Sequence, residues 1–255
     1  MVDLRFRWNG SELIPADGAP VVPLYVADSW LVSEGNVVAL EEHYDRFARS
    51  CAVQGLVRPV DAFIAAVTVA LPRMGRVFPR IDLTERGELE LWIRPAPAPA
   101  TAIVLATAST DVRSEPTIKG PDLAALNDLR DSSRERGADD AVILDPAGHI
   151  IDGATTCLLW WRDGELLTPP AKATRVDSVT VKVVRHIAAT HGISVAEEWA
   201  TPADLADLTV WALNSLHGIR HVTAWIDGPS LSSDPSLLAT WRDSYSRLST
   251  PLGER

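Results

Sequence analysis

Lysine is rare in this chain of 255 residues, because only three of its 24 basic residues are lysines and the rest are arginines. Lys119 lies in the stretch EPTIKGPDL (115–123), where proline and glycine interrupt regular structure just ahead of a helical pattern. Lys172 and Lys182 lie on polar faces near another expected helix start, where a solvated amine is the expected role. A lysine amine can act as a nucleophile. Lys119 is therefore the first candidate for chemistry.

Other residues are suited to binding charged groups. Asp152 lies in the run IDGATT, and Arg46 lies in the run EEHYDRFARS. Arg94 ends the strand pattern LELWIR, and a planar guanidinium can grip two oxygens of a carboxylate or a phosphate. A helix is expected to begin near Val179 and Thr180, and the N–H groups of a helix start favour phosphate. A hairpin aspartate can instead bond to its own turn, and a helix-surface arginine can simply be solvated.

Hydrophobic spacing predicts the elements that must position these residues. Strands are expected at 3–8, 20–32, 89–95, 101–109 and 222–228, with three short strands within 139–169. Helices are expected at 40–55, about 60–74, 122–137 and 178–193, with Asp177 or Ser178 as the cap of the last, and Thr201 opens a segment that runs into a further strand. Because helices and strands alternate without a regular βαβ rhythm, the pattern favours an α+β fold of two lobes.

The run PAPAPA at 95–100 breaks the pattern of elements. Alternating proline and alanine favour an extended, stiff connection. We therefore expect a smaller N-terminal α+β domain of residues 1–100 and a larger C-terminal domain of residues 101–255.

Composition excludes several classes of protein. The formal charge of −10 argues against a nucleic-acid partner, which requires clustered basic residues. No apolar run is long enough for a transmembrane helix, and the N-terminal residues lack the apolar core of a signal peptide. Cys51 and Cys157 are too few for a disulfide framework, and no cluster of cysteine and histidine suggests a metal. A cytoplasmic protein without a membrane partner is expected.

Several sequence segments follow one another in an order that is typical of one enzyme family. Gly137 follows Lys119 by eighteen residues, and the runs DDAVILD and IDGATT come next. EEHYDRFARS lies upstream, and DGELLTPP and DSVT lie downstream. Together they resemble the fold type IV family of pyridoxal-phosphate (PLP) enzymes, which includes D-amino acid and branched-chain aminotransferases and 4-amino-4-deoxychorismate lyase. The resemblance covers roughly residues 24–228, and it implies a D-amino acid aminotransferase-like fold with PLP bound by the larger domain.

The resemblance also implies roles for single residues. Lys119 would bond covalently to PLP and move the substrate's α-proton, and Asp152 would keep the pyridine nitrogen protonated where most relatives carry glutamate. The residues implied to bind the cofactor are Arg46, Lys119, Asp152, Val179, Thr180 and Ser215. Those implied to line the substrate side are Ala27, Arg94, Leu216 and His217, although a lone loop histidine is more often structural.

The run CLLWWRDGELLTP (157–169) resembles the lyase branch more than the aminotransferases. It therefore favours an aminodeoxychorismate lyase-like enzyme of folate biosynthesis that eliminates pyruvate and leaves 4-aminobenzoate. An aminotransferase acting on a D- or branched-chain amino acid and a 2-oxo acid is the alternative. A non-catalytic protein on the same scaffold is a third reading, because the chain departs from the family pattern. Ala27 replaces an aromatic residue, Asp28 a glutamate, Cys157 an asparagine and Val181 an arginine. Relatives build their sites at a dimer interface, so a homodimer is expected.

Overall fold

The computed structural model describes residues 3–18, 23–56 and 60–253, and it divides into two compact units. The first unit comprises Met1–Ala98, Ile118–Leu123 and Leu248–Arg255, and the second comprises Pro99–Thr117 and Ala124–Arg247. The domains expected from the sequence differ from these units at three places, the first being Pro99 and Ala100, which belong to the second unit. The segment that contains Lys119 and the C-terminal residues both belong to the first unit rather than to the second.

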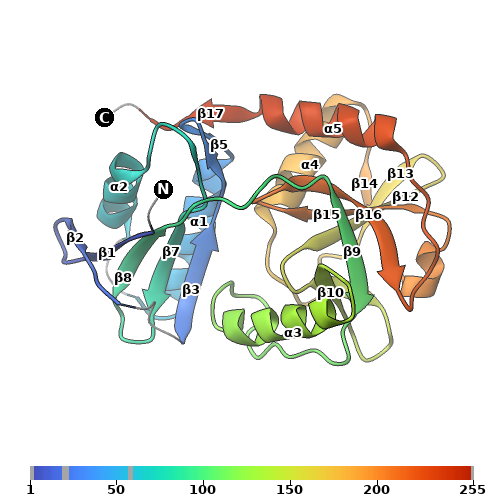
Figure 1. The fold of residues 1–255 in the computed structure, drawn as a ribbon, viewed down its shortest axis with the longest axis horizontal. Coiled ribbons are helices and arrows are strands. Elements are labelled where there is room, and N and C mark those ends of the chain that lie inside the picture. The colour runs from blue at the N-terminus through green and yellow to red at the C-terminus, as the bar shows by residue number, and fades with distance from the viewer. Residues whose placement is uncertain (1–2, 19–22, 57–59, 254–255) are drawn as a thin grey trace. The chain divides into compact units, whose positions relative to one another are not determined.

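An antiparallel sheet of five strands forms the frame of the first unit (Figure 1). Its order is β2 (Leu13–Pro15), β1 (Leu4–Trp8), β8 (Leu89–Ile93), β7 (Arg80–Thr84) and β3 (Leu24–Ser29). A second sheet has the order β17 (Ser249–Pro251), β5 (Asn36–Val38), β4 (Val32–Ser33) and β6 (Arg76–Val77). The helices of this unit are α1 (Leu40–Val53) and α2 (Asp61–Ala70).

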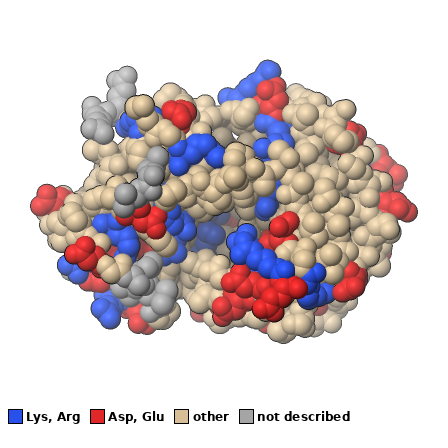
Figure 2. Space-filling view, viewed as in Figure 1, with Lys and Arg blue, Asp and Glu red and all other residues tan. Residues whose placement is uncertain are grey.

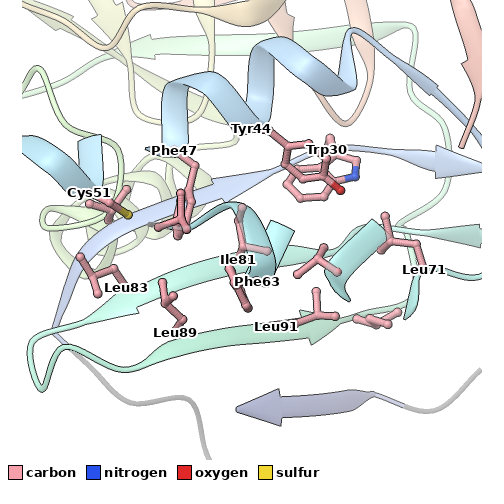
Figure 3. Packing of buried hydrophobic residues seen from close by; sticks show 14 of the residues in the cluster. Trp30, Tyr44, Phe47, Cys51, Phe63, Leu71, Ile81, Leu83, Leu89 and Leu91 are labelled. Carbon is pink, nitrogen blue, oxygen red and sulfur yellow. The ribbon is translucent and has the colours of Figure 1, made fainter. Parts of the chain in front are cut away.

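Helix α1 forms because its apolar residues recur at three- and four-residue steps and share one face. Figure 3 shows Phe47 and Cys51 of this face among the side chains of Ile81 and Leu83 from the sheet. Phe47 also meets Phe63 of α2, with ring centroids 6.3 Å apart. Burial of such side chains stabilises the unit by roughly 1.5–3 kcal/mol each. The opposite side of the helix is left for polar residues.

The strands of this sheet alternate between an apolar face and a polar face. In β7, Ile81 and Leu83 belong to the hydrophobic core, whereas the side chains of Arg80 and Asp82 form an ion pair at 2.8 Å. Strand β8 follows the same rule, and Arg94 comes directly after it. The chain thereby places buried charges on one face of the sheet.

An eight-stranded mixed sheet forms the second unit. Its order is β11 (Ile150–Gly153), β10 (Asp140–Leu144), β9 (Ala102–Thr107), β16 (Gly218–Ile226), β15 (Thr209–Asn214), β12 (Cys157–Arg162), β13 (Glu165–Thr168) and β14 (Val195–Glu197). Strand β9 runs parallel to both of its neighbours, and β13 runs parallel to β14. The helices are α3 (Leu123–Glu135), α4 (Val179–Thr190), the short 3-10 helix η1 (Pro202–Leu205) and α5 (Pro235–Arg247). Helices α4 and α5 pack against each other and against β15 and β16 (Figure 1).

One expectation about the second unit is wrong, and one element was not predicted. Residues 139–169 form four strands rather than three, because β11 and β12 are separated by a tight turn at Ala154–Thr156. Helix α5 was not expected at all. In the first unit, the strand expected at 20–32 is β3 followed by β4, and its first residues lie outside the described part of the chain.

Charged side chains of both signs lie interspersed among a larger uncharged area on the face shown in Figure 2. Within the described ranges, no helix is both long and apolar enough to cross a membrane. In the same ranges, no group of three or more histidine, cysteine, aspartate or glutamate residues could hold a metal ion.

Candidate functional site

Lys119 lies in the loop before α3, and the backbone of β3 fixes its position. Its carbonyl oxygen accepts a hydrogen bond from the N–H of Ala27 at 2.6 Å. The next residue, Gly120, has a φ of +138°, and a Cβ there would stand 2.6 Å from the nitrogen of Ala27 and 2.7 Å from the carbonyl carbon of Val26. Only glycine fits so close to a strand backbone at this φ. The contact therefore holds Lys119 beside β3.

Asp28, the residue after Ala27, is the centre of a buried charged network. Its two carboxylate oxygens accept hydrogen bonds from Nε and Nη2 of Arg46, both at 2.8 Å, and Oδ1 also lies 2.8 Å from Nδ1 of His43. Burial opposes ionisation here, but Arg46 and His43 together hold the pKa of Asp28 well below its usual range. Arg46, the predicted phosphate ligand, is thus oriented by a two-point ion pair.

His43 of this network is neutral at neutral pH. Burial lowers its pKa more than Asp28 raises it, and the positive charges of Arg46 and Lys119 lower it further. The hydrogen bond between the carbonyl of Lys119 and the N–H of Ala27, the neighbour of Asp28, places the backbone of the lysine close to the Asp28 network. The structure therefore gathers Lys119, Ala27 and Arg46, three of the predicted site residues, in one part of the first unit.

Arg94, the predicted carboxylate ligand, is held between two aromatic rings of the same unit. Its guanidinium carbon lies 5.0 Å from the ring centre of Phe78 and 4.7 Å from that of Trp92, and its Nε donates to the carbonyl of Phe78 at 3.1 Å. Burial, together with the charge of Arg80, lowers the pKa of Arg94 to about 10, so the group stays a cation at neutral pH. Its orientation is fixed before any anion arrives.

Asp152 is 8% exposed and ends the apolar run of β11 in the second unit. Its Oδ1 accepts a hydrogen bond from Sγ of Cys157 at 3.4 Å, and its Oδ2 lies 3.8 Å from Nη1 of Arg113. Burial raises the pKa of Asp152 to about 6, against the opposing charges of Arg175 and Arg113. The carboxylate is thus ionised at neutral pH but near its titration range.

The turn that follows Asp152 is braced by two further polar residues. Asp140 Oδ2 accepts hydrogen bonds from Thr155 N at 3.2 Å, Thr155 Oγ1 at 3.1 Å and Thr156 Oγ1 at 2.8 Å. Asn214 Nδ2 donates to the carbonyl of Thr155 at 3.3 Å. Because the turn joins β11 to β12, these bonds fix both Asp152 and its thiol partner.

Helix α4 starts at the residues that the sequence predicted. Ser178 is the N-cap, and its hydroxyl accepts a hydrogen bond from Val181 N at 3.3 Å. The N–H groups of Val179 and Thr180 come before any intrahelical acceptor, as at every helix start. Both residues are 3% exposed. The positive end of the helix dipole adds to their attraction for an anion.

The loop between β15 and β16 contains Ser215, Leu216 and His217, all of them partly buried. Asn214 fixes this loop as well, because its Oδ1 accepts a hydrogen bond from His217 N at 2.9 Å. Nδ1 of His217 accepts a hydrogen bond from Ala100 N at 3.3 Å. One ring nitrogen of His217 therefore forms a hydrogen bond within the fold. This agrees with the expectation that a lone loop histidine is more often structural than functional.

Comparison with known families identifies the chain. The sequence model of the amino-transferase class IV family matches residues 25–225. The chain belongs to this family. The match includes every predicted site residue of this class IV aminotransferase.

Solved structures with the same fold support this assignment. The chain superposes on the fold IV transaminase CpuTA1 from Curtobacterium pusillum with a TM-score of 0.80 at 20% identity, covering 96% of this chain and 98% of that one. It superposes on the branched-chain aminotransferase from Thermoproteus uzoniensis with norvaline with a TM-score of 0.81 at 20% identity, covering 98% and 100%. For a PLP-bound hypothetical aminotransferase from Mycobacterium tuberculosis, the TM-score is 0.79 at 17% identity, covering 97% and 98%. No curated protein sequence matches the chain significantly.

The family and the fold predicted from the sequence are confirmed by these comparisons. The prediction of a PLP-dependent enzyme is confirmed at the level of the family. The roles of single residues and the choice between lyase and aminotransferase stay predictions.

The predicted residues, each taken within its own unit, carry the chemical groups that PLP requires. An amine, a buried acid and the N–H groups of a helix start are the chemical groups that a pyridine aldehyde phosphate requires. Nε of Arg175 is buried without a hydrogen-bond partner in the described residues, and Arg175 is the cation with the largest effect on the pKa of Asp152. The surroundings of the predicted ring-nitrogen partner thus contain a buried donor for which a bound molecule could supply the acceptor.

Sequence reasoning missed four residues of the second unit that support Asp152. They are Arg113, Asp140, Arg175 and Asn214. Asp140 lies in the run DDAVILD, which carried the resemblance, so that run already marked its position. Arg113, Arg175 and Asn214 are brought to the turn by tertiary folding, and no local pattern indicates their role.

Proposed function

We propose that this class IV aminotransferase binds PLP through Lys119 and transfers the amino group of a small amino acid to a 2-oxo acid. The observation that carries the proposal is the position of Lys119, pinned to β3 by Ala27 and Gly120. The other two lysines have different surroundings. Lys182 pairs with Asp177 at 2.8 Å, and Nζ of Lys172 lies 5.5 Å from the ring centre of Trp199.

PLP, when bound, supplies an electron sink that stabilises negative charge at the substrate's α-carbon. The amine of Lys119 takes the proton from that carbon and returns it within the site. Asp152 holds a proton on the ring nitrogen of the cofactor, and a buried carboxylate suits this task because little water competes for it.

The remaining predicted residues bind and orient. The N–H groups of Val179 and Thr180, with the guanidinium of Arg46, bind the phosphate. Ser215 lies on a loop fixed by Asn214 and adds a hydroxyl. Arg94, held between its two aromatic rings, binds the substrate's carboxylate.

The segment that favours the lyase, residues 157–169, supports it only weakly, because several of its apolar residues belong to the hydrophobic core. Leu158 and Trp160 of β12 and Leu167 of β13 are buried in the hydrophobic core of the second unit. The similar structures reported above are described as a transaminase and aminotransferases. These descriptions favour amino-group transfer, and the lyase remains the second candidate on the strength of residues 157–169.

Two assays on the purified, PLP-loaded protein separate the candidates. In the first, branched-chain and D-amino acids are supplied with 2-oxoglutarate, and glutamate is measured. In the second, 4-amino-4-deoxychorismate is supplied, and pyruvate and 4-aminobenzoate are measured. Glutamate without pyruvate supports the proposal, whereas pyruvate without glutamate establishes the lyase. The absence of both products, together with no uptake of PLP, would leave a non-catalytic protein on the same scaffold.

A further inference from the structure

Helix α5 is anchored in the second unit by one fully enclosed side chain. Trp241 is 2% exposed, and its ring centre lies 5.3 Å from that of Trp211 and 5.5 Å from that of Trp161. His191, which follows the last residue of α4, closes the cluster at 5.7 Å. An aromatic cluster of this kind resists displacement, because each ring contributes a large buried area and edge-to-face contacts. The helix is therefore a rigid support for whatever its next turn contacts.

The residue after this anchor reaches the loop between β15 and β16. Nη1 of Arg242 donates to the carbonyl of His217 at 3.0 Å and also to the carbonyl of Ile219. These two carbonyls flank Gly218, where the chain enters β16. One guanidinium thus fixes the end of the loop that contains Ser215.

Tyr245 lies one helical turn beyond Trp241 and contacts both predicted phosphate-binding segments. Its ring lies against Gly218, where a Cβ would stand 3.1 Å from Cε1 of the tyrosine, and Gly218 has a φ of +66°. Its hydroxyl lies close enough to the side chain of Thr180, at the start of α4, for this contact to oppose the rise of the tyrosine pKa. Burial raises the pKa of Tyr245 to about 12, so this hydroxyl keeps its proton at all ordinary pH values.

We infer that the last two turns of α5 position the phosphate-binding groups, with Tyr245 orienting the hydroxyl of Thr180 and Arg242 fixing the loop that contains Ser215. The inference rests on the proposed function, since it assigns the cofactor's phosphate to these two segments. Tyr245 and Arg242 are positioning residues, because they act through Thr180 and through the backbone of the loop.

A role in positioning makes a prediction that a role in packing alone does not. If Tyr245 acts through the phosphate ligand Thr180, its hydroxyl matters for PLP and not for pyridoxal, which lacks the phosphate. If it only fills space, removal of the hydroxyl affects both ligands alike or neither. The same reasoning predicts that the hydroxyls of Tyr245 and Thr180 act as one unit.

The test compares Tyr245→Phe, Thr180→Val and the double variant by titration of cofactor-free protein with PLP and with pyridoxal. Loss of one hydrogen bond corresponds to roughly a 2- to 10-fold weaker dissociation constant. We expect that loss for PLP in Tyr245→Phe, no change for pyridoxal, and no further loss when Tyr245→Phe is added to Thr180→Val. Tyr25→Phe is the matched control, because Tyr25 is 42% exposed.

Arg242→Lys tests the second contact, with Arg247→Lys as its control on the exposed end of the same helix. We expect Arg242→Lys to weaken PLP binding and to leave pyridoxal binding and the far-ultraviolet circular dichroism unchanged. Equal effects on the two ligands, additive effects of the two hydroxyls, or no effect on PLP would overturn the inference. If the unsubstituted protein takes up no PLP, the proposed function itself fails. If it does take up PLP and the variants behave like their controls, only the role of α5 is lost.

Discussion

Asp152 balances two opposed effects within a single side chain. Burial raises its pKa to about 6, and the nearby guanidinium groups of Arg175 and Arg113 limit the rise. In its proposed role the residue must stay ionised in order to hold a proton on the cofactor. The buried carboxylate thus lowers the stability of the protein in order to serve the reaction, a compromise common at functional sites.

Replacement of Asp152 by asparagine should therefore have opposite effects on activity and on stability. Loss of the charge weakens the proposed hold on the ring nitrogen, so turnover should fall roughly 30- to 150-fold, equivalent to about 2–3 kcal/mol. Cofactor-free Asp152→Asn should be more stable than the unsubstituted protein at pH 7, by about 1–3 kcal/mol. Turnover assays and denaturant unfolding measure the two effects.

The size of the stability effect depends on pH. An acid with a raised folded-state pKa destabilises the native state once it is ionised, so stability falls as the pH rises from about 4 to about 6. The gain in Asp152→Asn should accordingly disappear at pH 4. Asp163→Asn, at an exposed turn, serves as the control and should show neither effect. Unchanged turnover in Asp152→Asn would reject its proposed role.

Asp28→Asn should destabilise the first unit, because it leaves the guanidinium of Arg46 without its carboxylate partner. Removal of one member of a buried ion pair costs about 3–5 kcal/mol. The pKa of Asp28 is lowered in the folded state, so its contribution is present at neutral pH and is lost as the pH falls below its ordinary value of 3.8. Asp45→Asn on the exposed side of α1 should change stability by less than about 0.5 kcal/mol. Equal unfolding midpoints for the two variants at pH 7 would contradict the network.

At the scale of elements, the position of Lys119 depends on one contact between a loop and a strand. Gly120→Ala would push its Cβ into the backbone of β3, at 2.6 Å from Ala27 N. Such overpacking costs about 1–3 kcal/mol and should displace the lysine, so PLP uptake should fall. Gly137→Ala is the control, because Gly137 also has a positive φ of +89° but has nothing within 4 Å of its Cβ position. It should lose about 1 kcal/mol of stability and keep full PLP uptake. Normal uptake in Gly120→Ala would show that the contact is not needed.

The elements that carry the candidate site are mostly those that local pattern predicts. Helix α1 follows its apolar spacing, and α4 begins at the predicted Ser178 cap. Each of these signals is local, because the residues that form it lie within a few positions of one another in the sequence. The turn between β11 and β12 was missed because Asp140 and Asn214, which hold it, come from other strands. Helix α5 was missed because, of its residues, only Trp241 is fully buried, so its apolar periodicity is weak.

At the scale of the whole molecule, the class IV aminotransferase presents its candidate residues from both compact units. Lys119, Arg46 and Arg94 belong to the first unit, and Asp152 and Thr180 belong to the second. Residues with proposed roles in one reaction therefore belong to two units, each of which has its own hydrophobic core. The predicted homodimer and cytoplasmic location stay predictions, and light scattering on the purified protein would test the first.

The central claim is that Lys119 carries PLP. Borohydride reduction of the PLP-loaded protein fixes the cofactor to its lysine, and peptide mapping by mass spectrometry then locates it. We predict a pyridoxyl group on Lys119 alone, and Lys119→Ala should abolish labelling while the fold is retained. A label on Lys172 or Lys182, or no label on any lysine, would contradict the account.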